Sequence, residues 1–125
     1  MPRLTDDQLD AEVLHYLKQH RGMKNRIGRW ALVAKIYGPA AALDESDNNL
    51  YDRQIRESVE RLRKSGVLIC DMGDGAGRFL PETVEEYQAF RLKYGGRAFQ
   101  IMETLREMDK AAEGEFSDVK QPRLI

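Results

Sequence analysis

The side chains best suited to chemistry with a nucleic acid lie between residues 49 and 61. Arginine and glutamine can form paired hydrogen bonds with the edges of guanine and adenine in the DNA major groove. The candidates for such base contacts are Arg53, Gln54, Arg56 and Arg61. Asn49 and Tyr51 come just before them and carry polar groups that suit contacts with backbone phosphates. Together these residues indicate a surface for double-stranded DNA.

The same residues also fit a solvent-exposed helix face without a ligand. Glu57 lies four residues before Arg61, and this is the favourable order for an ion pair along a helix. Residues 50–66 hold five bases and three acids. Glutamates that face outward would repel phosphate. The residues alone leave both interpretations open.

A second group of basic residues precedes this segment. The chain has a net charge of −1, yet residues 13–43 contain six bases and no acid. Arg26 and Arg29 are candidates for phosphate contacts, because no acid in the segment neutralises them. Trp30 falls on an apolar helical stripe and is predicted to be a core residue. Residues 82–118 instead carry nine acids and five bases, which predicts an electrically polarised molecule.

No catalytic or metal centre is predicted. His15 and His20 are five residues apart, which puts them on different faces of a helix, and no cluster of cysteines or carboxylates accompanies them. The glycine-rich residues 73–77 lack the lysine and the following helix of a phosphate-binding loop, so a turn is their expected role. No nucleophile, base and orienting group can be assembled. We predict a non-enzymatic protein without cofactor, metal or small-molecule substrate.

Three helices are predicted to position the candidate residues. Thr5 and Gln8 have the pattern of a capping box, which starts the first helix. Ile27 begins a short extended segment. The second helix ends at Gly38-Pro39, a pair that no helix continues through.

The third helix carries the candidate base contacts. Its apolar face, predicted to be buried, consists of Tyr51, Ile55, Val59 and Leu62. Its opposite face is charged and consists of Arg53, Glu57, Glu60 and Lys64. Asn48 or Asn49 would cap its start, and Ser65-Gly66 ends it.

A β-hairpin is predicted to follow the third helix. Residues 67–70 and 78–80 favour extended structure, and the three glycines and two aspartates between them have the chemistry of a turn. Arg78 follows this turn directly. There it is a candidate for contact with the DNA backbone or minor groove.

The end of the chain is predicted to be a separate helical region. Residues 82–113 form a helical extension and residues 114–125 a flexible tail. Apolar residues recur in steps of three and four from Tyr87 to Ala112, as in a coiled-coil seam. Gly95-Gly96 interrupts this seam and predicts a kink or break. The candidates for a homodimer or partner contact are Ile101, Leu105 and Met108.

This order of elements predicts a fold that is α+β and mainly helical. Residues 1–81 would form a winged helix–turn–helix, with a three-helix core and a β-hairpin wing. A long or kinked C-terminal helix follows. In winged-helix domains the third helix enters the major groove and the wing touches the backbone beside it.

Several motifs within residues 25–105 resemble a family of small phage and prophage winged-helix proteins. The motifs are an Asp-Arg-x-Ile-Arg helix, a Leu-Arg-x-x-Gly step, an Ile-Cys pair, and a glutamate followed later by an arginine. The matching residues are Asp52, Arg53, Ile55, Arg56, Leu62, Arg63, Gly66, Ile69, Cys70, Glu86 and Arg97. Arg78-Phe79 stands where the family has an aromatic pair. The resemblance implies DNA binding in a regulatory or replication-associated role.

Other features bear on location and partners. With one cysteine, Cys70, no internal disulfide can form, which favours a reducing, cytoplasmic setting. No apolar run is long enough to span a bilayer, and residues 1–10 lack the pattern of a secretory signal. Residues 121–125, Gln-Pro-Arg-Leu-Ile, resemble the peptide by which replication proteins dock on the bacterial sliding clamp.

Two functions from different classes therefore follow from the sequence. The leading hypothesis is binding of double-stranded DNA by a phage- or prophage-type winged-helix protein. The alternative is a non-enzymatic interaction or adaptor module that uses the same fold and its acidic C-terminal helix. Salt-dependent DNA affinity would separate the first from the second.

Overall fold

The computed structural model describes residues 4–116 of the chain. They are mainly helical, with four α-helices and one two-stranded antiparallel sheet, in agreement with the predicted class. The chain divides into two compact units whose boundary lies between Phe90 and Arg91, and each is described by itself. In the described part, no helix is both long and apolar enough to cross a membrane.

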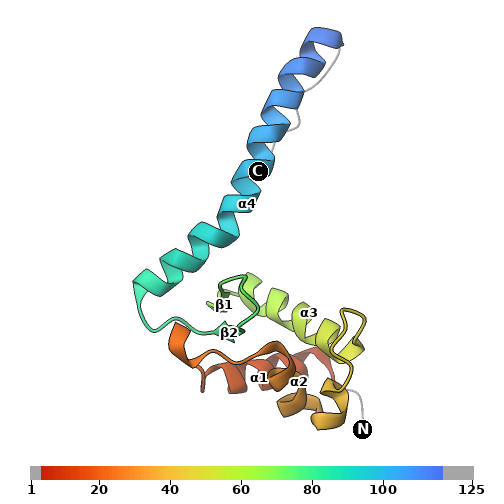
Figure 1. Ribbon diagram of the computed structural model, residues 1–125, viewed down its shortest axis with the longest axis vertical. Helices are drawn as coiled ribbons and strands as arrows, with labels where there is room; N and C mark the ends of the chain where they lie inside the picture. The colour runs from red at the N-terminus through yellow and green to blue at the C-terminus, as the bar shows by residue number, and fades with distance from the viewer. Residues whose placement is uncertain (1–3, 117–125) are drawn as a thin grey trace. The chain divides into compact units, whose positions relative to one another are not determined.

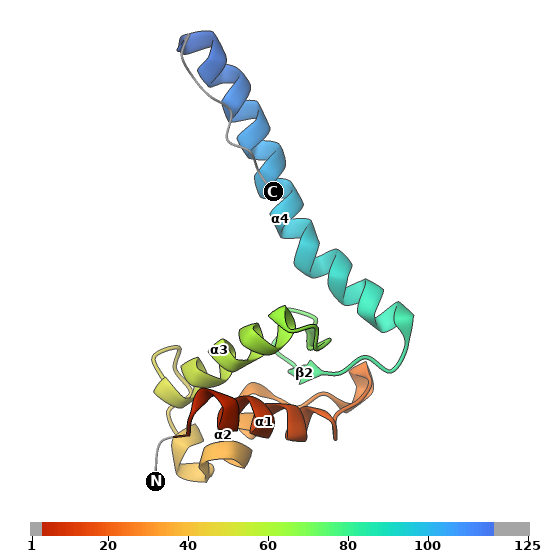
Figure 2. The same cartoon turned by 180° about the vertical axis from the view of Figure 1, so that it is seen from behind.

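The first unit is built on three helices, α1 (Asp6–Leu17), α2 (Arg29–Tyr37) and α3 (Leu50–Lys64). Figures 1 and 2 show α1 and α2 on one side of α3, and all three pack against one another. Short 3₁₀ turns, η1 (Met23–Asn25) and η2 (Pro39–Ala42), connect them. The fully buried side chains at their centre include Val13, Leu17, Leu32, Val33 and Ile55. Trp30 packs half-buried against this core, as predicted.

Local signals determine where the helices begin and end. The capping box at the start of α1 is present, with the Thr5 hydroxyl accepting from the Gln8 N–H and the Gln8 side chain accepting from the Thr5 N–H. Gly38 ends α2 at φ 97°, a conformation that residues with a Cβ rarely adopt. Asn49 caps α3. These ends agree with the sequence-based predictions.

The buried face of α3 differs from the prediction at one residue. Ile55, Val59 and Leu62 are buried as predicted, but Tyr51 is 43% exposed. It lies in the first turn of α3, where its ring packs on that of Tyr37 with 4.8 Å between centroids. Tyr51 therefore covers the edge of the core and does not enter it.

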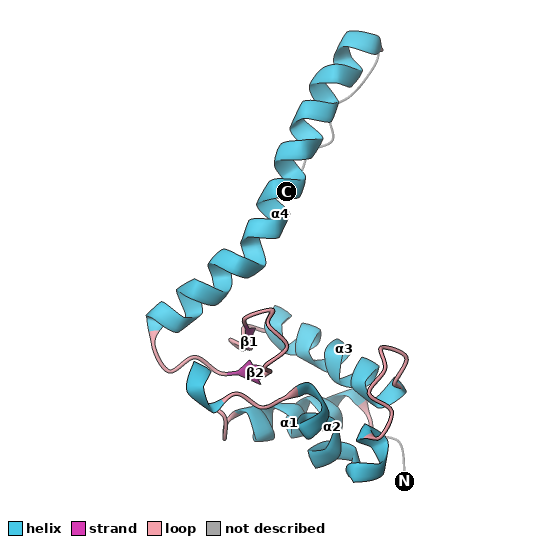
Figure 3. Cartoon of the chain, viewed as in Figure 1, coloured by secondary structure: helices cyan, strands magenta, loops and turns pink. Residues whose placement is uncertain are grey.

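The hairpin is shorter than predicted and is joined by a third segment. Strand β1 (Cys70–Asp71) pairs with β2 (Arg78–Phe79) in the register Cys70 to Phe79 (Figure 3). Val67 to Ile69 stay outside the ladder: the Val67 N–H donates to the Leu62 carbonyl at 3.0 Å, and the Ile69 carbonyl accepts from Arg63 Nε at 2.9 Å. Ile27 exchanges two backbone hydrogen bonds with Arg78, both of 2.9 Å.

The last helix, α4 (Val84–Glu115), begins within the first unit. Phe90 is buried against Cys70 and Phe79. The Glu86 carboxylate accepts from the Met23 N–H at 2.7 Å and from the Glu82 N–H at 2.8 Å. These contacts attach the start of α4 to the hairpin and to η1.

Of the kink or break predicted at Gly95-Gly96, the break is wrong. The helix α4 is continuous through both glycines, and neither has a positive φ. Glycine costs about 1 kcal/mol relative to alanine inside a helix. Most of the predicted tail, residues 117–125, lies outside the described residues.

Candidate nucleic-acid interface

A buried carboxylate organises the arginines on one flank of α3. Asp52 is fully buried, and its Oδ2 accepts from Arg29 Nη2 at 2.7 Å and from Arg56 Nε at 3.0 Å. Burial raises the pKa of Asp52, but the hydrogen bond from Arg29 and the charges of Arg29, Arg56 and Arg78 outweigh it and lower that pKa below 3.8. Arg29 also pairs with Asp47 at 3.0 Å. Asp52 thus stays ionised and holds two predicted DNA contacts in place.

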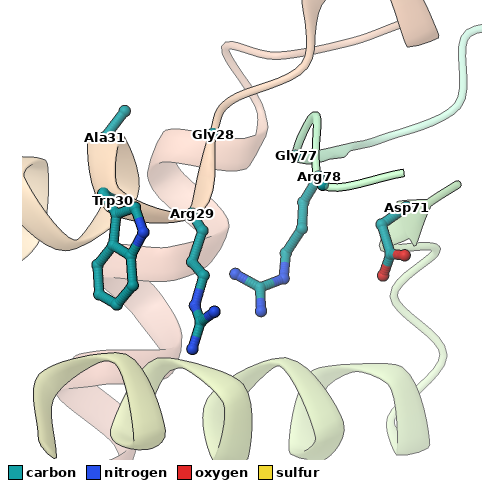
Figure 4. A pocket seen from close by; sticks show the side chains of 8 residues that line it. Gly28, Arg29, Trp30, Ala31, Asp71, Gly77 and Arg78 are labelled. Atoms are coloured by element: carbon teal, nitrogen blue, oxygen red, sulfur yellow. The ribbon is translucent and has the colours of Figure 1, made fainter. Parts of the chain in front are cut away.

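A pocket of about 500 Å³ lies where the start of α2 meets the hairpin (Figure 4). Its lining residues are Gly28, Arg29, Trp30, Ala31, Asp71, Gly75, Gly77 and Arg78. In Figure 4 the guanidinium groups of Arg29 and Arg78 both extend toward α3. The Arg29 guanidinium lies 4.5 Å from the centroid of the Trp30 ring. The pocket is therefore walled by two cations and an aromatic ring.

Arg78 is the unpaired cation of this pocket. It is half-buried, and its guanidinium makes no hydrogen bond or ion pair within residues 4–116. Burial lowers the pKa of Arg78; the carboxylates of Asp52 and Asp71 oppose this shift, whereas Arg63 and Arg29 add to it. A half-buried cation without a partner is costly in the free protein and favours an incoming anion.

Two ion pairs hold the hairpin beside α3 and α2. Arg63 Nη2 lies 3.2 Å from Asp71 Oδ2 on β1. Arg26 Nη1 lies 2.9 Å from Asp74 Oδ2 in the turn. The sequence predicts a phosphate contact for Arg26, but in the structure its charge anchors the hairpin.

On the other flank of α3, two predicted base contacts face the protein. Arg61 forms a two-pronged ion pair with Asp10 of α1, with Nη2–Oδ1 at 2.8 Å and Nε–Oδ2 at 3.1 Å. The hydrogen bond from Arg61 lowers the pKa of Asp10 despite the opposing effect of burial. Gln54 Oε1 accepts from the Tyr37 hydroxyl at 2.7 Å. Neither side chain presents its full hydrogen-bonding edge to solvent.

Asn49 has a structural role and does not fit a phosphate contact. Only 4% of it is exposed. Its Oδ1 accepts from the backbone N–H groups of Tyr51 and Asp52, and its Nδ2 donates to the carbonyls of Ala41 and Asp44. The whole hydrogen-bonding capacity of the amide is therefore used to cap α3 and fold the preceding loop.

Arg53 is the predicted base contact that the structure leaves free. It is exposed, and in residues 4–116 its side chain has no hydrogen bond or ion pair. It lies three residues before Arg56 on neighbouring positions of the helix surface. The outer face of α3 also exposes Glu57, Glu60 and Lys64, as predicted. Tyr51, two residues before Arg53, is exposed on a different side of the helix.

Sequence reasoning missed the central role of Asp52. Its spacing of four residues from Arg56 is a readable signal, because carboxylate-to-arginine pairs at that spacing meet on a helix. The contact of Asp52 with Arg29 cannot be predicted from residue spacing, since the two residues lie on different helices. The basic segment 13–43 therefore looks unneutralised in the sequence, although acids elsewhere pair with Arg26 and Arg29.

Comparison with known proteins returned no protein-family model, no curated protein and no solved structure that matches this chain. Residues 121–125 lie outside the described part, so docking on a sliding clamp stays a prediction. In that described part, no group of three or more histidines, cysteines, aspartates or glutamates could hold a metal ion.

Proposed function

We propose that this chain is a non-enzymatic winged-helix protein that binds double-stranded DNA in a regulatory or replication-associated role. The family it resembles in sequence, that of small phage and prophage winged-helix proteins, suggests the same role. The binding surface would consist of the outer face of α3, the start of α2 and the hairpin.

The order and pairing of the elements support the winged-helix part of this proposal. Three helices are followed by a hairpin, and Ile27, between α1 and α2, pairs with Arg78 of β2. A short extended segment between the first two helices belongs to the element order of a winged helix. In a winged-helix protein the third helix would enter the major groove and the hairpin would touch the backbone beside it.

One observation carries the DNA-binding part. Arginines from three separate elements lie around α3: Arg29 of α2 and Arg78 of the hairpin line one pocket, Arg56 of α3 shares Asp52 with Arg29, and Arg53 is exposed on the outer face of α3. Guanidinium groups are well suited to phosphate and to guanine. Within residues 4–116 the guanidinium groups of Arg53 and Arg78 have no hydrogen bond or ion pair, which leaves their donors available to an anion, whereas Glu57 and Glu60, exposed on the outer face of α3, reduce the positive charge there.

The substitution Arg53→Ala tests the proposed surface. We expect it to weaken binding of a mixed-sequence duplex by about 5- to 150-fold, equal to about 1–3 kcal/mol for a base contact. Fluorescence anisotropy of a labelled duplex, at low and moderate salt, measures the change. A contact with phosphate alone would instead lower the slope of log affinity against log salt by about one.

Arg106→Ala is the matched control, because it removes the same charge from an exposed position on α4. We expect it to leave the affinity within about twofold of wild type, because Arg106 is not part of the proposed surface and salt screens exposed charges that make no direct contact. Equal affinities for Arg53→Ala and the wild-type chain would reject the outer face of α3 as the binding surface.

A second candidate function, assembly through α4, is favoured by apolar side chains in the second unit. Ile101 and Met108 are 53% and 59% exposed, seven residues apart on one face, with Leu105 between them. Large exposed apolar side chains that repeat every seven residues suit a helix–helix contact. A homodimer through this seam is compatible with DNA binding, whereas an adaptor would use the seam alone.

Charge substitutions on this seam test assembly. We expect the double variant Ile101→Glu and Met108→Glu to be monomeric at concentrations where the wild-type chain self-associates, because two buried carboxylates would lose hydration. Sedimentation equilibrium gives the molecular mass. Phe99→Glu is the control, since Phe99 is 58% exposed but lies on the opposite face of the helix. A wild-type chain that is monomeric throughout would end this candidate as a homodimer.

A further inference from the structure

We propose that the pocket between the start of α2 and the hairpin binds a single phosphate group through the Arg78 guanidinium and the first backbone N–H groups of α2. This site rests on the proposed function, in which the phosphate belongs to the DNA backbone. The chemistry of the pocket would equally suit the phosphate of a small molecule. Displacement of bound phosphate by a duplex distinguishes the two sources.

The first observation is that two pocket-lining arginines have unused donors. The guanidinium of Arg78 makes no hydrogen bond or ion pair in the described part of the chain. Arg29 uses Nη2 for its two aspartates, and its buried Nε has no partner there. Buried donors without an acceptor are rare in folded proteins, and each one identifies a place where an acceptor would be stabilising.

The second observation is the uncapped start of α2. Gly28 is the N-cap residue, and it has no side chain to accept from the first N–H groups of the helix. Arg29, Trp30 and Ala31 follow it, and all of them line the pocket. The N-terminus of a helix carries a partial positive charge and free donors, which suit a phosphate. A serine or aspartate at the N-cap position would have accepted hydrogen bonds from these N–H groups through its own side chain.

The third observation concerns the charges that face the pocket. Asp71 lines it, but the carboxylate is paired with Arg63. Asp52, whose Oδ1 is buried without a hydrogen-bond partner, already accepts from two arginines through Oδ2. The acids are thus each matched by an arginine, and Arg78 is the excess cation. An anion at this place meets a net positive charge.

The fourth observation is access. Gly28, Gly75 and Gly77 form parts of the wall without side chains, so an anion can approach the backbone closely. The volume of about 500 Å³ exceeds that of one phosphate and leaves room for an attached sugar. Trp30 in the wall offers a surface for that sugar or for a base.

The test is a titration of the ¹⁵N-labelled chain with inorganic phosphate at constant ionic strength, with chloride as the counterpart. We expect saturable shifts at the N–H groups of Trp30 and Ala31, at the Trp30 indole and at Arg78 Nε. Arg78→Gln is expected to weaken this binding about tenfold or more, as for loss of one charged hydrogen bond. Arg78→Lys keeps the charge but loses the planar fork, and should give an intermediate value.

Several results would overturn the proposal. These are shifts that rise linearly without saturation, shifts that chloride reproduces, or an unchanged affinity in Arg78→Gln. The wild-type titration decides the first two even if a variant fails to fold. Arg53→Gln is the control: it should lose DNA affinity and keep the phosphate site, so failure of DNA binding and failure of the pocket give different patterns. If the phosphate site is found, competition with a duplex identifies its ligand. Displacement of bound phosphate by the duplex would assign the site to DNA. No displacement would assign the site to a small phosphorylated ligand.

Discussion

Gly77→Ala is expected to lower the free energy of unfolding by about 3 kcal/mol or more. Gly77 has φ +119°, which residues with a Cβ rarely adopt, and an added Cβ would overlap the backbone carbonyl of Ile27. The overlap is with backbone, so no side chain can rotate away. The Ile27 segment and Arg78 would have to separate, and their two backbone hydrogen bonds would be lost.

Gly75→Ala is the matched control for this experiment. Gly75 also has a positive φ, +76°, but an added Cβ there meets nothing within 4 Å. Gly75→Ala is expected to lower the free energy of unfolding by about 1–2 kcal/mol, which is the cost of holding a residue with a Cβ at positive φ. Urea unfolding followed by the fluorescence of Trp30, the only tryptophan, measures both variants in the first unit. Equal losses in the two variants would show that the Ile27 contact adds nothing to stability.

Asp52→Ala is expected to cost about 2–4 kcal/mol. Removing one partner of a buried ion pair costs roughly 3–5 kcal/mol. The lower range applies because the side chains of Arg29 and Arg56 keep 34% and 46% of their surface in water. DNA affinity should fall as well, since both arginines lose the carboxylate that positions them.

Asp47→Ala is the control for Asp52→Ala. Asp47 pairs with the same arginine at 3.0 Å, but its side chain is 92% exposed. Exposed ion pairs contribute about 0–1 kcal/mol. A loss at Asp47 as large as that at Asp52 would contradict the role given to burial.

The cost of Asp52→Ala should depend on pH. The pKa of Asp52 is lowered in the folded chain, so its stabilising contribution is present above the unfolded value of 3.8 and is lost as the pH falls through the folded pKa. The difference in unfolding free energy between wild type and variant should therefore shrink as the pH is lowered below 3.8. Chemical denaturation at pH 7 and at successively lower values measures this difference. A constant difference would show that the Asp52 carboxylate does not act through its charge.

The sequence by itself determined the local features of this protein. The helix ends follow from Thr5, Gly38 and Asn49, because a cap or a left-handed glycine acts on backbone groups only a few residues away. The outer face of α3 follows from helical periodicity alone, and its charged residues are exposed as predicted. Strand lengths were less predictable, because the Ile69 carbonyl accepts a hydrogen bond from the Arg63 side chain and not from a neighbouring strand.

Only the tertiary structure decided which arginines are available. Arg61 meets Asp10 across 51 residues of chain, Arg26 meets Asp74 across 48, and Arg29 meets Asp52 across 23. No local pattern encodes such pairs, because packing of separate elements brings them together. The sequence treats all arginines of the candidate interface alike, whereas packing pairs most of them and leaves Arg53 and Arg78 without partners in the described chain. The physical reason is that a charge is neutralised by what lies near it in space, and nearness along the chain is only part of that.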